Sequence, residues 1–492
     1  MPKRTLSAGT PPAEAARPPV PGRYAVVHAD ERRFVYVPQI QELFEAPADV
    51  VGALEQADIP APRVVDLRQA DHLDFDERSG LATLDAAREA IARLAHKEVG
   101  RPLPLDARDD RQPGLQDLVV HVAQVCNLAC GYCYAEDLNK AKATMSLDVA
   151  ESVVQRAMKL APAGLHSVKF LGGEPTLAWD VARYLMTRFE EEASARALRL
   201  PMFVTVTNGT RMTEAICDDM IRHRMYVLVS LDGEADVHDR NRPFIGGRGS
   251  HTKVVGSLRR MIEAGLRPAV EAVYTSAHLD AGVTIRDLVD YYYDLGIREA
   301  QITIALGVWH RLDTGSAIEQ VRADFVDAAR WSVRSFAGDD PFLLRGIQFV
   351  LTGFATKTRR THVCGAGRTF MAVNHDGEAF PCYLLQSPST SYGFVDSRWS
   401  AERYADVGTR FDKNGKHHHP VCRECWANEI CQSCLGSTYL IERDIAKPPA
   451  WFCGLQKALI SAVLAEIGVM RTSPAWPNFM ANLTRATARP AA

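Results

Sequence analysis

Hydrophobic and polar positions follow two alternating patterns along the middle of this chain. Short, strand-like runs occupy residues 118–124, 167–173, 202–210, 226–233, 268–275 and 300–306. Between them, as in residues 146–161 and 252–265, apolar side chains recur every three or four positions. Runs of the first kind are typical of buried strands, and stretches of the second kind are typical of amphipathic helices. The pattern predicts six strand–helix units, and therefore an α/β fold with a parallel sheet covered by helices.

The pattern changes on both sides of this α/β region. Residues 1–22 are rich in Pro and Ala, and we expect a disordered tail there. Residues 23–112 combine short strands with two helical patterns and predict a small α+β domain. The strand–helix alternation defines a domain at 113–340, and a cysteine-rich stretch defines another at 341–460. A C-terminal helix and tail are expected at 461–492.

Composition and charge exclude several classes of protein. The chain has 492 residues, of which 47% are hydrophobic, and its net charge is −3, so nothing indicates a nucleic-acid or anionic-membrane partner. We find no run of about 18 apolar residues and no apolar segment near the N-terminus, so we expect neither a transmembrane helix nor a secretory signal. The predicted location is cytoplasmic. In a reducing cytosol, eleven cysteines indicate metal or redox chemistry more than disulfides.

Three of these cysteines stand close together after the first predicted strand. Cys126, Cys130 and Cys133 lie in the sequence CNLACGYC. Thiolates suit zinc and iron–sulfur clusters, but a closed structural zinc site takes four ligands. Three cysteines in one short loop therefore favour a four-iron cluster with one iron left open, and a zinc site completed by a distant residue is the alternative.

Other polar and glycine-rich segments also follow strands. LGGEP, TNGT and SLDG end the second, third and fourth predicted strands. The carboxyl ends of parallel strands are where α/β sheets and barrels place their active sites. These segments contain the candidate site residues Gly172, Gly173, Glu174, Thr207, Asn208, Ser230 and Asp232.

These motifs together resemble the radical S-adenosylmethionine (SAM) enzymes. The resemblance implies a partial (β/α)6 barrel in which the three cysteines hold a [4Fe-4S] cluster that binds SAM. It also implies that the GGEP residues hold the SAM amino group and that the TNGT and SLDG residues contact its ribose and carboxylate. Tyr132 would lie at the adenine, and Arg242 is a candidate partner of the SAM carboxylate. One electron would then cleave SAM to a 5′-deoxyadenosyl radical, which abstracts a hydrogen atom from the substrate.

The later cysteines have the spacing of a second known module. Their sequence resembles the SPASM domain of peptide-modifying radical SAM enzymes, which holds two auxiliary [4Fe-4S] clusters, giving three clusters in all. The resemblance assigns Cys422, Cys425, Cys431 and Cys453 to a distal cluster, and Cys364, Cys382 and Cys434 to a proximal one. Only two residues separate Cys431 from Cys434, where the family usually has three. No fourth proximal cysteine is present, so that cluster would have an open iron or recruit His362.

The resemblance implies an oxidoreductase that matures a ribosomally made precursor peptide (RiPP) by an intramolecular cross-link, with a thioether favoured over a carbon–carbon cyclophane. The 23–112 region resembles the winged-helix-like element that binds leader peptides, and ferredoxin or flavodoxin is the expected electron donor. Three alternatives are a sulfatase maturase of the formylglycine type, a small-molecule dehydrogenase, and a non-catalytic peptide-binding iron–sulfur electron carrier. Maturases of the first type have an aspartate where this chain has Tyr383. Candidates for a catalytic base are Tyr383, His238 and Asp232.

Overall fold

The computed structural model describes residues 25–29, 32–38, 41–45, 51, 114–305, 312, 315–356, 361–413, 415–416, 418–419, 421–423 and 425–487. The predicted tail at 1–22 lies outside these residues, as do nearly all of the helical patterns expected within 48–99. The domain boundaries at 22 and 112 therefore stay predictions.

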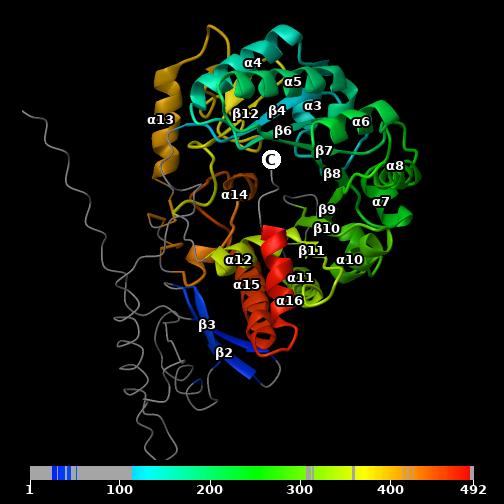
Figure 1. Cartoon of the computed structure of the whole chain (residues 1–492), viewed down its shortest axis with the longest axis vertical. Helices are drawn as coiled ribbons and strands as arrows, with labels where there is room; N and C mark the ends of the chain where they lie inside the picture. Colours follow the sequence, from blue (N-terminus) through cyan, green and yellow to red (C-terminus); the bar gives the residue numbers. More distant parts are fainter. Residues whose placement is uncertain are drawn as a thin grey trace, which may run out of the picture.

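A curved parallel sheet forms the centre of the described structure (Figure 1). Six of its strands run parallel to one another and are neighbours in sequence order, as the alternation predicts. They are β4 (Asp117–Gln124), β6 (Ser167–Gly172), β7 (Met202–Thr207), β8 (Tyr226–Ser230), β9 (Ala269–Tyr274) and β10 (Glu299–Ile304).

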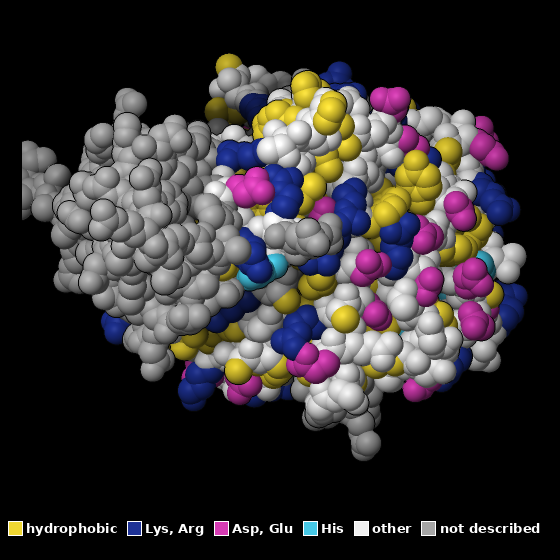
Figure 2. Space-filling model, turned by 90° about the horizontal axis from the view of Figure 1, so that it is seen from below, with side chains coloured by type: hydrophobic (Ala, Val, Ile, Leu, Met, Phe, Trp, Pro, Cys, Tyr) yellow, Lys and Arg dark blue, Asp and Glu magenta, His cyan; other side chains and the backbone are white. Residues whose placement is uncertain are grey.

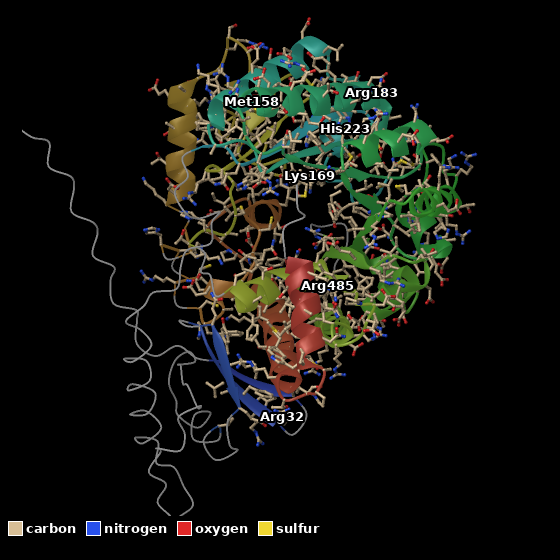
Figure 3. The ribbon with its side chains drawn as sticks, viewed as in Figure 1. Arg32, Met158, Lys169, Arg183, His223 and Arg485 are labelled. Atoms are coloured by element: carbon tan, nitrogen blue, oxygen red, sulfur yellow. The ribbon has the colours of Figure 1, made fainter. Side chains whose placement is uncertain are left out.

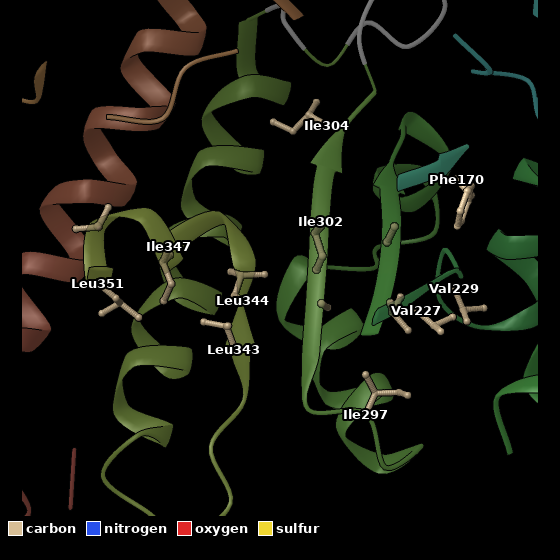
Figure 4. Close-up of a cluster of buried hydrophobic side chains, with 14 of the residues drawn as sticks. Phe170, Val227, Val229, Ile297, Ile302, Ile304, Leu343, Leu344, Ile347 and Leu351 are labelled. Carbon is tan, nitrogen blue, oxygen red and sulfur yellow. The ribbon is translucent and has the colours of Figure 1, made fainter. Parts of the chain in front are cut away.

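Helices cover the outer face of this sheet and bury its outward-pointing side chains (Figure 1). They are α4 (Leu147–Leu160), α5 (Trp179–Ala195), α6 (Glu214–Arg222), α7 (Ala235–Asn241), α8 (His251–Glu263), α9 (Ser276–Asp280), α10 (Ile285–Asp294) and α11 (Gly315–Ser335). Ser146 caps α4, because its hydroxyl accepts a hydrogen bond from the backbone N–H of Val149 at 3.3 Å. Figure 4 shows Ile302, Val227 and Phe170 among the buried side chains of the core.

The sheet continues past the predicted boundary at residue 340. The strand β11 (Leu343–Leu344) pairs in parallel with β10, and β12 (Phe370–Val373) pairs in parallel with β4 at the opposite side. The short strands β13 (Glu378–Phe380) and β14 (Gly393–Phe394) extend that side in antiparallel fashion. The cysteine-rich region is therefore joined to the barrel by backbone hydrogen bonds.

The remaining elements are mostly short and lie in loops or in the C-terminal third. They are α3 (Glu136–Asn139), β5 (Ala143–Thr144), the 3-10 helix η2 (Pro175–Ala178), α12 (Arg345–Thr356), α13 (Ala401–Asp412), η3 (Asn428–Ile430), α14 (Leu435–Glu442), α15 (Ala450–Arg471) and α16 (Trp476–Thr487). The N-terminal strands β1 (Ala25–Ala29), β2 (Arg32–Val37) and β3 (Glu42–Glu45) form a separate antiparallel sheet. This small sheet packs on α15, so the two ends of the described chain lie together.

The helix α15 differs from the expectation that no segment is apolar enough to cross a membrane. Its 22 residues pass that test by length and composition, and 56% of its most apolar stretch is buried inside the protein. Glu466 lies in this helix, is 2% exposed, and accepts two hydrogen bonds of 2.7 Å from Arg334 of α11. Packing against α11 and β1 makes α15 a core helix of this fold.

Charged side chains are mixed on the surface. Figure 2 shows basic and acidic side chains interspersed over the described part of one face, with hydrophobic ones between them. This distribution agrees with the small net charge of −3.

Candidate functional site

The first three cysteines lie in the loop directly after β4, at the carboxyl end of the sheet. Cys126, Cys130 and Cys133 are free thiols, each partly buried. Burial raises the pKa of Cys126 to about 11 and that of Cys130 to about 12. Thiolates in this loop therefore need a cation to stabilise them, and a coordinating metal provides that charge.

Two glycines hold the end of β6 against this loop. The backbone N–H of Gly173 donates to the carbonyl of Ala123 at 2.7 Å, and that of Glu174 donates to the carbonyl of Val125 at 2.9 Å. A Cβ at Gly172 would lie 1.9 Å from the Ala123 oxygen, and one at Gly173 would lie 2.2 Å from the Val125 oxygen. Only glycine permits this approach, which fixes the backbone immediately before Cys126.

The Glu174 side chain ties the loop after β6 to the loop after β7. One of its carboxylate oxygens accepts hydrogen bonds from the Thr176 N–H at 3.0 Å, the Thr176 hydroxyl at 2.7 Å and the Thr207 hydroxyl at 2.7 Å. The other oxygen accepts from the Asn208 N–H at 2.7 Å. Glu174 is 0% exposed, and burial raises its pKa. In this arrangement the carboxylate positions both loops.

Asn208 continues the connection to the cysteine loop. Its amide nitrogen donates to the Asn127 side-chain oxygen at 2.9 Å and lies 3.8 Å from the Cys126 sulfur. Asn127 in turn donates to the Thr210 hydroxyl at 2.8 Å. The TNGT segment therefore supports the cysteine loop through side-chain hydrogen bonds, and donors beside a ligating sulfur tune the cluster that it binds.

A second segment, residues 241–249, lies along the cysteine loop. The N–H of Ala129 donates to the Pro243 carbonyl at 2.8 Å, and the N–H of Ile245 donates to the Asn127 carbonyl at 3.1 Å. A further bond of 3.3 Å runs from the Gly131 N–H to the Asn241 carbonyl. The sequence did not predict this backbone pairing, which fixes the conformation of the loop between Cys126 and Cys133.

Asp232, Arg242 and Tyr132 form a buried cluster beside the cysteines. The Arg242 guanidinium donates to Asp232 at 3.0 Å, and the Tyr132 hydroxyl donates to the same carboxylate. Burial acts most strongly and raises the pKa of Asp232, but the charge and hydrogen bond of Arg242, together with His238 and Tyr132, hold that pKa below its usual value. The Nε atom of Arg242 is buried and has no hydrogen-bond partner among the described residues. An unpartnered guanidinium donor fits a ligand carboxylate, so this site is suited to the SAM carboxylate.

Two of the three candidate bases are engaged in this buried structure. Asp232 is 0% exposed and also accepts from the Val273 N–H at 3.0 Å. His238 is 0% exposed, and its ring nitrogens contact the Asp232 N–H at 3.1 Å and the Ser250 hydroxyl at 2.9 Å. Burial lowers the pKa of His238 to about 4. Both side chains therefore support the loop after β8, where Ser230 is also buried, and neither is placed to take a proton from a substrate.

The third candidate base, Tyr383, lies on the inner face of the sheet. Its ring centroid is 5.7 Å from that of Tyr134 and 6.4 Å from that of Phe370. Burial raises the pKa of Tyr383 well above its usual value, which makes the phenol a poor base near neutral pH. Tyr134 follows Cys133 directly and Tyr383 follows Cys382, so this aromatic contact joins the two cysteine regions.

Two charged residues of the inner face were missed by the sequence analysis. Lys169 of β6 and Glu271 of β9 are both half-buried, and Figure 3 places Lys169 toward the interior of the curved sheet, with Arg183 on its outer helical layer. Burial lowers the pKa of Lys169, while the nearby charge of Glu271 opposes this shift. Glu271 also raises the pKa of Tyr134, after the larger effects of burial and Cys133. A lone charge inside a buried strand is rare, and this signal was available in the sequence.

Seven of the remaining eight cysteines fall into the two groups that the resemblance predicts, and the eighth, Cys217, is buried in α6. Cys431 is close enough to Cys422, Cys425 and Cys453 for their charges to raise its pKa, although burial has the largest effect. In the same way, Cys434 and Cys364 raise the pKa of Cys382 in addition to burial. We call these the distal group (Cys422, Cys425, Cys431 and Cys453) and the proximal group (Cys364, Cys382 and Cys434).

The side chains near these groups also fit clusters. Both amide atoms of Asn428, beside the distal group, are buried without a hydrogen-bond partner among the described residues. The Nδ1 atom of His362, the candidate fourth proximal ligand, contacts the Thr361 hydroxyl and the Arg368 guanidinium, each at 2.8 Å, and its Nε2 atom lies 3.8 Å from an Asp412 oxygen.

No three metal-binding side chains of the described residues converge on a point that could hold a single ion. In a four-iron cluster each cysteine binds a different iron, so this finding does not test the assignment. The metal ligands stay predictions.

Comparison with known proteins agrees with this site. Residues 120–294 match the radical SAM superfamily, and the chain is a radical SAM enzyme, as its cysteine motif indicates. This excludes the non-catalytic electron carrier considered from the sequence.

The chain is more particularly related to anaerobic sulfatase-maturating enzymes. It is similar to the cysteine-type enzyme of Clostridium novyi (strain NT), with 23% identity over 338 residues that cover 65% of this chain and 87% of that protein. The serine-type enzyme of Klebsiella aerogenes is 28% identical over 364 residues, which cover 70% of this chain and 84% of the relative. The solved structure of native anSMEcpe with bound AdoMet has a TM-score of 0.61 and 20% identity, covering 73% of this chain and 100% of that one. The shared fold confirms the α/β barrel.

Proposed function

We propose that this radical SAM enzyme modifies a ribosomally made precursor peptide and installs an intramolecular cross-link in it, with a thioether favoured over a cyclophane. Two similarities support a peptide substrate. The relatives are maturating enzymes by name, and one solved structure with a TM-score of 0.60 is native anSMEcpe with bound AdoMet and Cp18Cys peptide. We propose that ferredoxin or flavodoxin supplies the electron, and that the protein is cytoplasmic.

The chemistry of the bound groups would be hydrogen-atom abstraction by a radical derived from SAM, with auxiliary clusters accepting the second electron of the oxidation. The residues of this chain have separate proposed roles. Asp232 and Arg242 orient the SAM carboxylate, and Glu174 holds the two adjoining loops in register. Tyr134 and Tyr383 enclose the space between the first cysteine loop and the proximal group.

The observation that carries the thioether proposal is the composition of the proximal group. It contains three cysteines, and we propose that His362 is not a fourth ligand, because its Nδ1 atom is engaged by Thr361 and Arg368 at 2.8 Å and its Nε2 atom faces Asp412 at 3.8 Å. A proximal cluster on these ligands has an open iron, to which a substrate thiolate is the matching soft donor. A thioether then forms when a substrate C–H and S–H lose two hydrogens. One leaves as a hydrogen atom, and the other leaves as a proton and an electron.

Glu271 is the proposed acceptor of that proton. It lies on the inner face near Tyr134, and Lys169 provides a positive charge close to it. This proposal replaces Asp232 and His238 as candidate bases, because both of those side chains are buried in the SAM-binding cluster.

Formylglycine formation is the second candidate, because the curated relatives are sulfatase-maturating enzymes. That reaction exchanges the sulfur of a cysteine for oxygen and removes two hydrogens. Tyr383 occupies the position of the expected aspartate base, and its raised pKa makes it unsuited to that role. A tyrosine at this position therefore favours cross-link formation over formylglycine formation.

The test is co-expression of the enzyme with each short open reading frame that flanks its gene, followed by mass spectrometry of the peptides. A peptide that loses two hydrogens, and no longer does so when its cysteine is changed to serine, supports a thioether. Loss of two hydrogens from the serine variant would exclude a thioether; it would establish a cyclophane where an aldehyde reagent does not label the product, and formylglycine made from that serine where the reagent does. Exchange of sulfur for oxygen in a cysteine peptide would establish formylglycine formation and overturn the cross-link.

A further inference from the structure

A lysine is buried beside the distal group of cysteines. Lys416 is 2% exposed, and its ammonium donates to the backbone carbonyls of Asn428 at 2.7 Å and Cys431 at 2.8 Å. The ammonium also lies 5.3 Å from the centre of the Phe349 ring. Both carbonyls belong to the short segment between Cys425 and Cys434, so the positive charge is fixed inside the loop that carries the distal cysteines.

The charge of Lys416 acts on these cysteines. Its ammonium is close enough to Cys431 and Cys422 for its charge to reach both side chains. Lys457 also lies near the group and acts on Cys453, but this lysine is exposed to solvent. Water and salt screen an exposed charge far more than a buried one.

The neighbouring amide of Asn428 gives a second, independent indication. Asn428 is 5% exposed, and neither its amide nitrogen nor its amide oxygen has a hydrogen-bond partner among the described residues. Buried amides are normally hydrogen-bonded. A sulfur-rich anion held by Cys422, Cys425, Cys431 and Cys453 is a matching acceptor for the Asn428 N–H.

Burying an ammonium is unfavourable unless anions close to it compensate its charge. Four thiolates and their cluster are such an anion. Positive charge and N–H donors near an iron–sulfur cluster raise its reduction potential, because they stabilise the more negative, reduced state.

We infer that Lys416 is a positioning residue of the redox chemistry, which raises the reduction potential of the distal cluster through its fixed charge, assisted by the Asn428 amide. This inference rests on the auxiliary clusters of the proposed function. With this charge beside it, the distal cluster would accept an electron more readily than a cluster held by the four cysteines alone.

The test is an anaerobic redox titration followed by electron paramagnetic resonance. The reconstituted full-length protein would carry Cys126→Ala/Cys130→Ala/Cys133→Ala, so that only auxiliary clusters contribute. A further Cys364→Ala/Cys382→Ala change removes the proximal signal and identifies the distal one. Lys416→Gln is the main variant, because its amide can still donate to a backbone carbonyl. Lys416→Arg keeps the charge, and Lys457→Gln is the matched control for loss of an exposed lysine.

We expect Lys416→Gln to move the distal midpoint potential to a more negative value at unchanged iron content. Lys416→Arg should stay near the parent protein, and Lys457→Gln should shift the potential much less. An unchanged potential in Lys416→Gln, or a shift no larger than that of Lys457→Gln, overturns the inference. Loss of iron from Lys416→Gln and Lys416→Arg alike would assign a structural role and would also overturn it.

Absence of the auxiliary clusters has a different signature, because the parent triple variant would then contain no iron, where about eight irons are expected for two four-iron clusters. Failure of the proposed cross-link is read from the peptide masses and leaves the iron content and the potentials unchanged.

Discussion

Gly173→Ala tests whether the glycine pair after β6 positions the first cysteine loop. A Cβ at residue 173 would lie 2.2 Å from the Val125 oxygen, whereas ordinary contacts begin at 3.4 Å. Because the atom that it meets belongs to the backbone, a side-chain rotation cannot relieve the overlap. The Val125 carbonyl would have to move by about 1 Å, and Cys126 follows it directly in the chain.

The magnitude follows from the contacts that the shift breaks. Overpacking costs about 1–3 kcal/mol. The backbone bonds from Gly173 to Ala123 at 2.7 Å and from Glu174 to Val125 at 2.9 Å would also be weakened, at about 0.5–1.5 kcal/mol each. We therefore expect a local cost of about 2–6 kcal/mol. If only about 1.4 kcal/mol of this cost is added to the activation free energy of SAM cleavage, the rate falls about tenfold.

The assay compares anaerobically reconstituted wild type with Gly173→Ala. We expect the variant to hold less iron at its first cluster and to form 5′-deoxyadenosine from SAM and dithionite at least about tenfold more slowly. Gly256→Ala in α8 is the control, because a Cβ there meets no atom within 4 Å, and alanine is the better helix former. Equal iron content and an equal rate in Gly173→Ala and wild type would refute the reasoning.

Three further variants test separate parts of the structure. Arg242→Lys should keep a charge beside Asp232 but lose the planar fork, so calorimetry should show SAM binding about tenfold weaker; an unchanged Kd would contradict the assigned carboxylate contact. Glu271→Gln should lower product formation about 10²-fold with a peptide that the wild type modifies, while 5′-deoxyadenosine still forms; equal turnover would exclude this base. A hydrogen bond from Arg188 lowers the pKa of Glu151 from 4.5 to about 2. The carboxylate therefore stabilises the fold fully above pH 4.5, and this contribution is lost as the pH falls toward 2. Thermal unfolding of Glu151→Gln should be flatter over that range, and a curve parallel to wild type would show that the pair contributes nothing.

Local sequence determined the parts of the fold that were predicted well. The strand expected at 118–124 is β4 at 117–124, because a run that is apolar on both faces has no other stable environment than a covered sheet. The first three cysteines were also predictable from their spacing within one loop, whereas the distal and proximal groups followed only from the resemblance, because Cys431 and Cys434 are three residues apart and fall in different groups. The extension of the sheet past residue 340 was not predicted. It depends on the pairing of β12 with β4, whose residues are about 250 positions apart.

The candidate bases illustrate a more general limit. Sequence reasoning placed Asp232 and His238 near the chemistry because they follow a strand, and the structure does place both near the first cysteine loop. Yet polar side chains at strand ends are often already hydrogen-bonded within the loops that they stabilise. Asp232 is an example, because it accepts hydrogen bonds of 3.0 Å from Arg242 and from the Val273 N–H.

Side chains that face a substrate inside a barrel come instead from the inner positions of the strands themselves. Lys169 and Glu271 occupy such positions on β6 and β9, with β7 and β8 between them in the sheet. The curvature of the sheet lets the charge of Glu271 act on Lys169 across the two strands between them, and no local pattern encodes that curvature. If Glu271 is the base, as proposed above, a charge in the middle of a buried strand is a better guide to a substrate-facing base in this fold than a charge at its end.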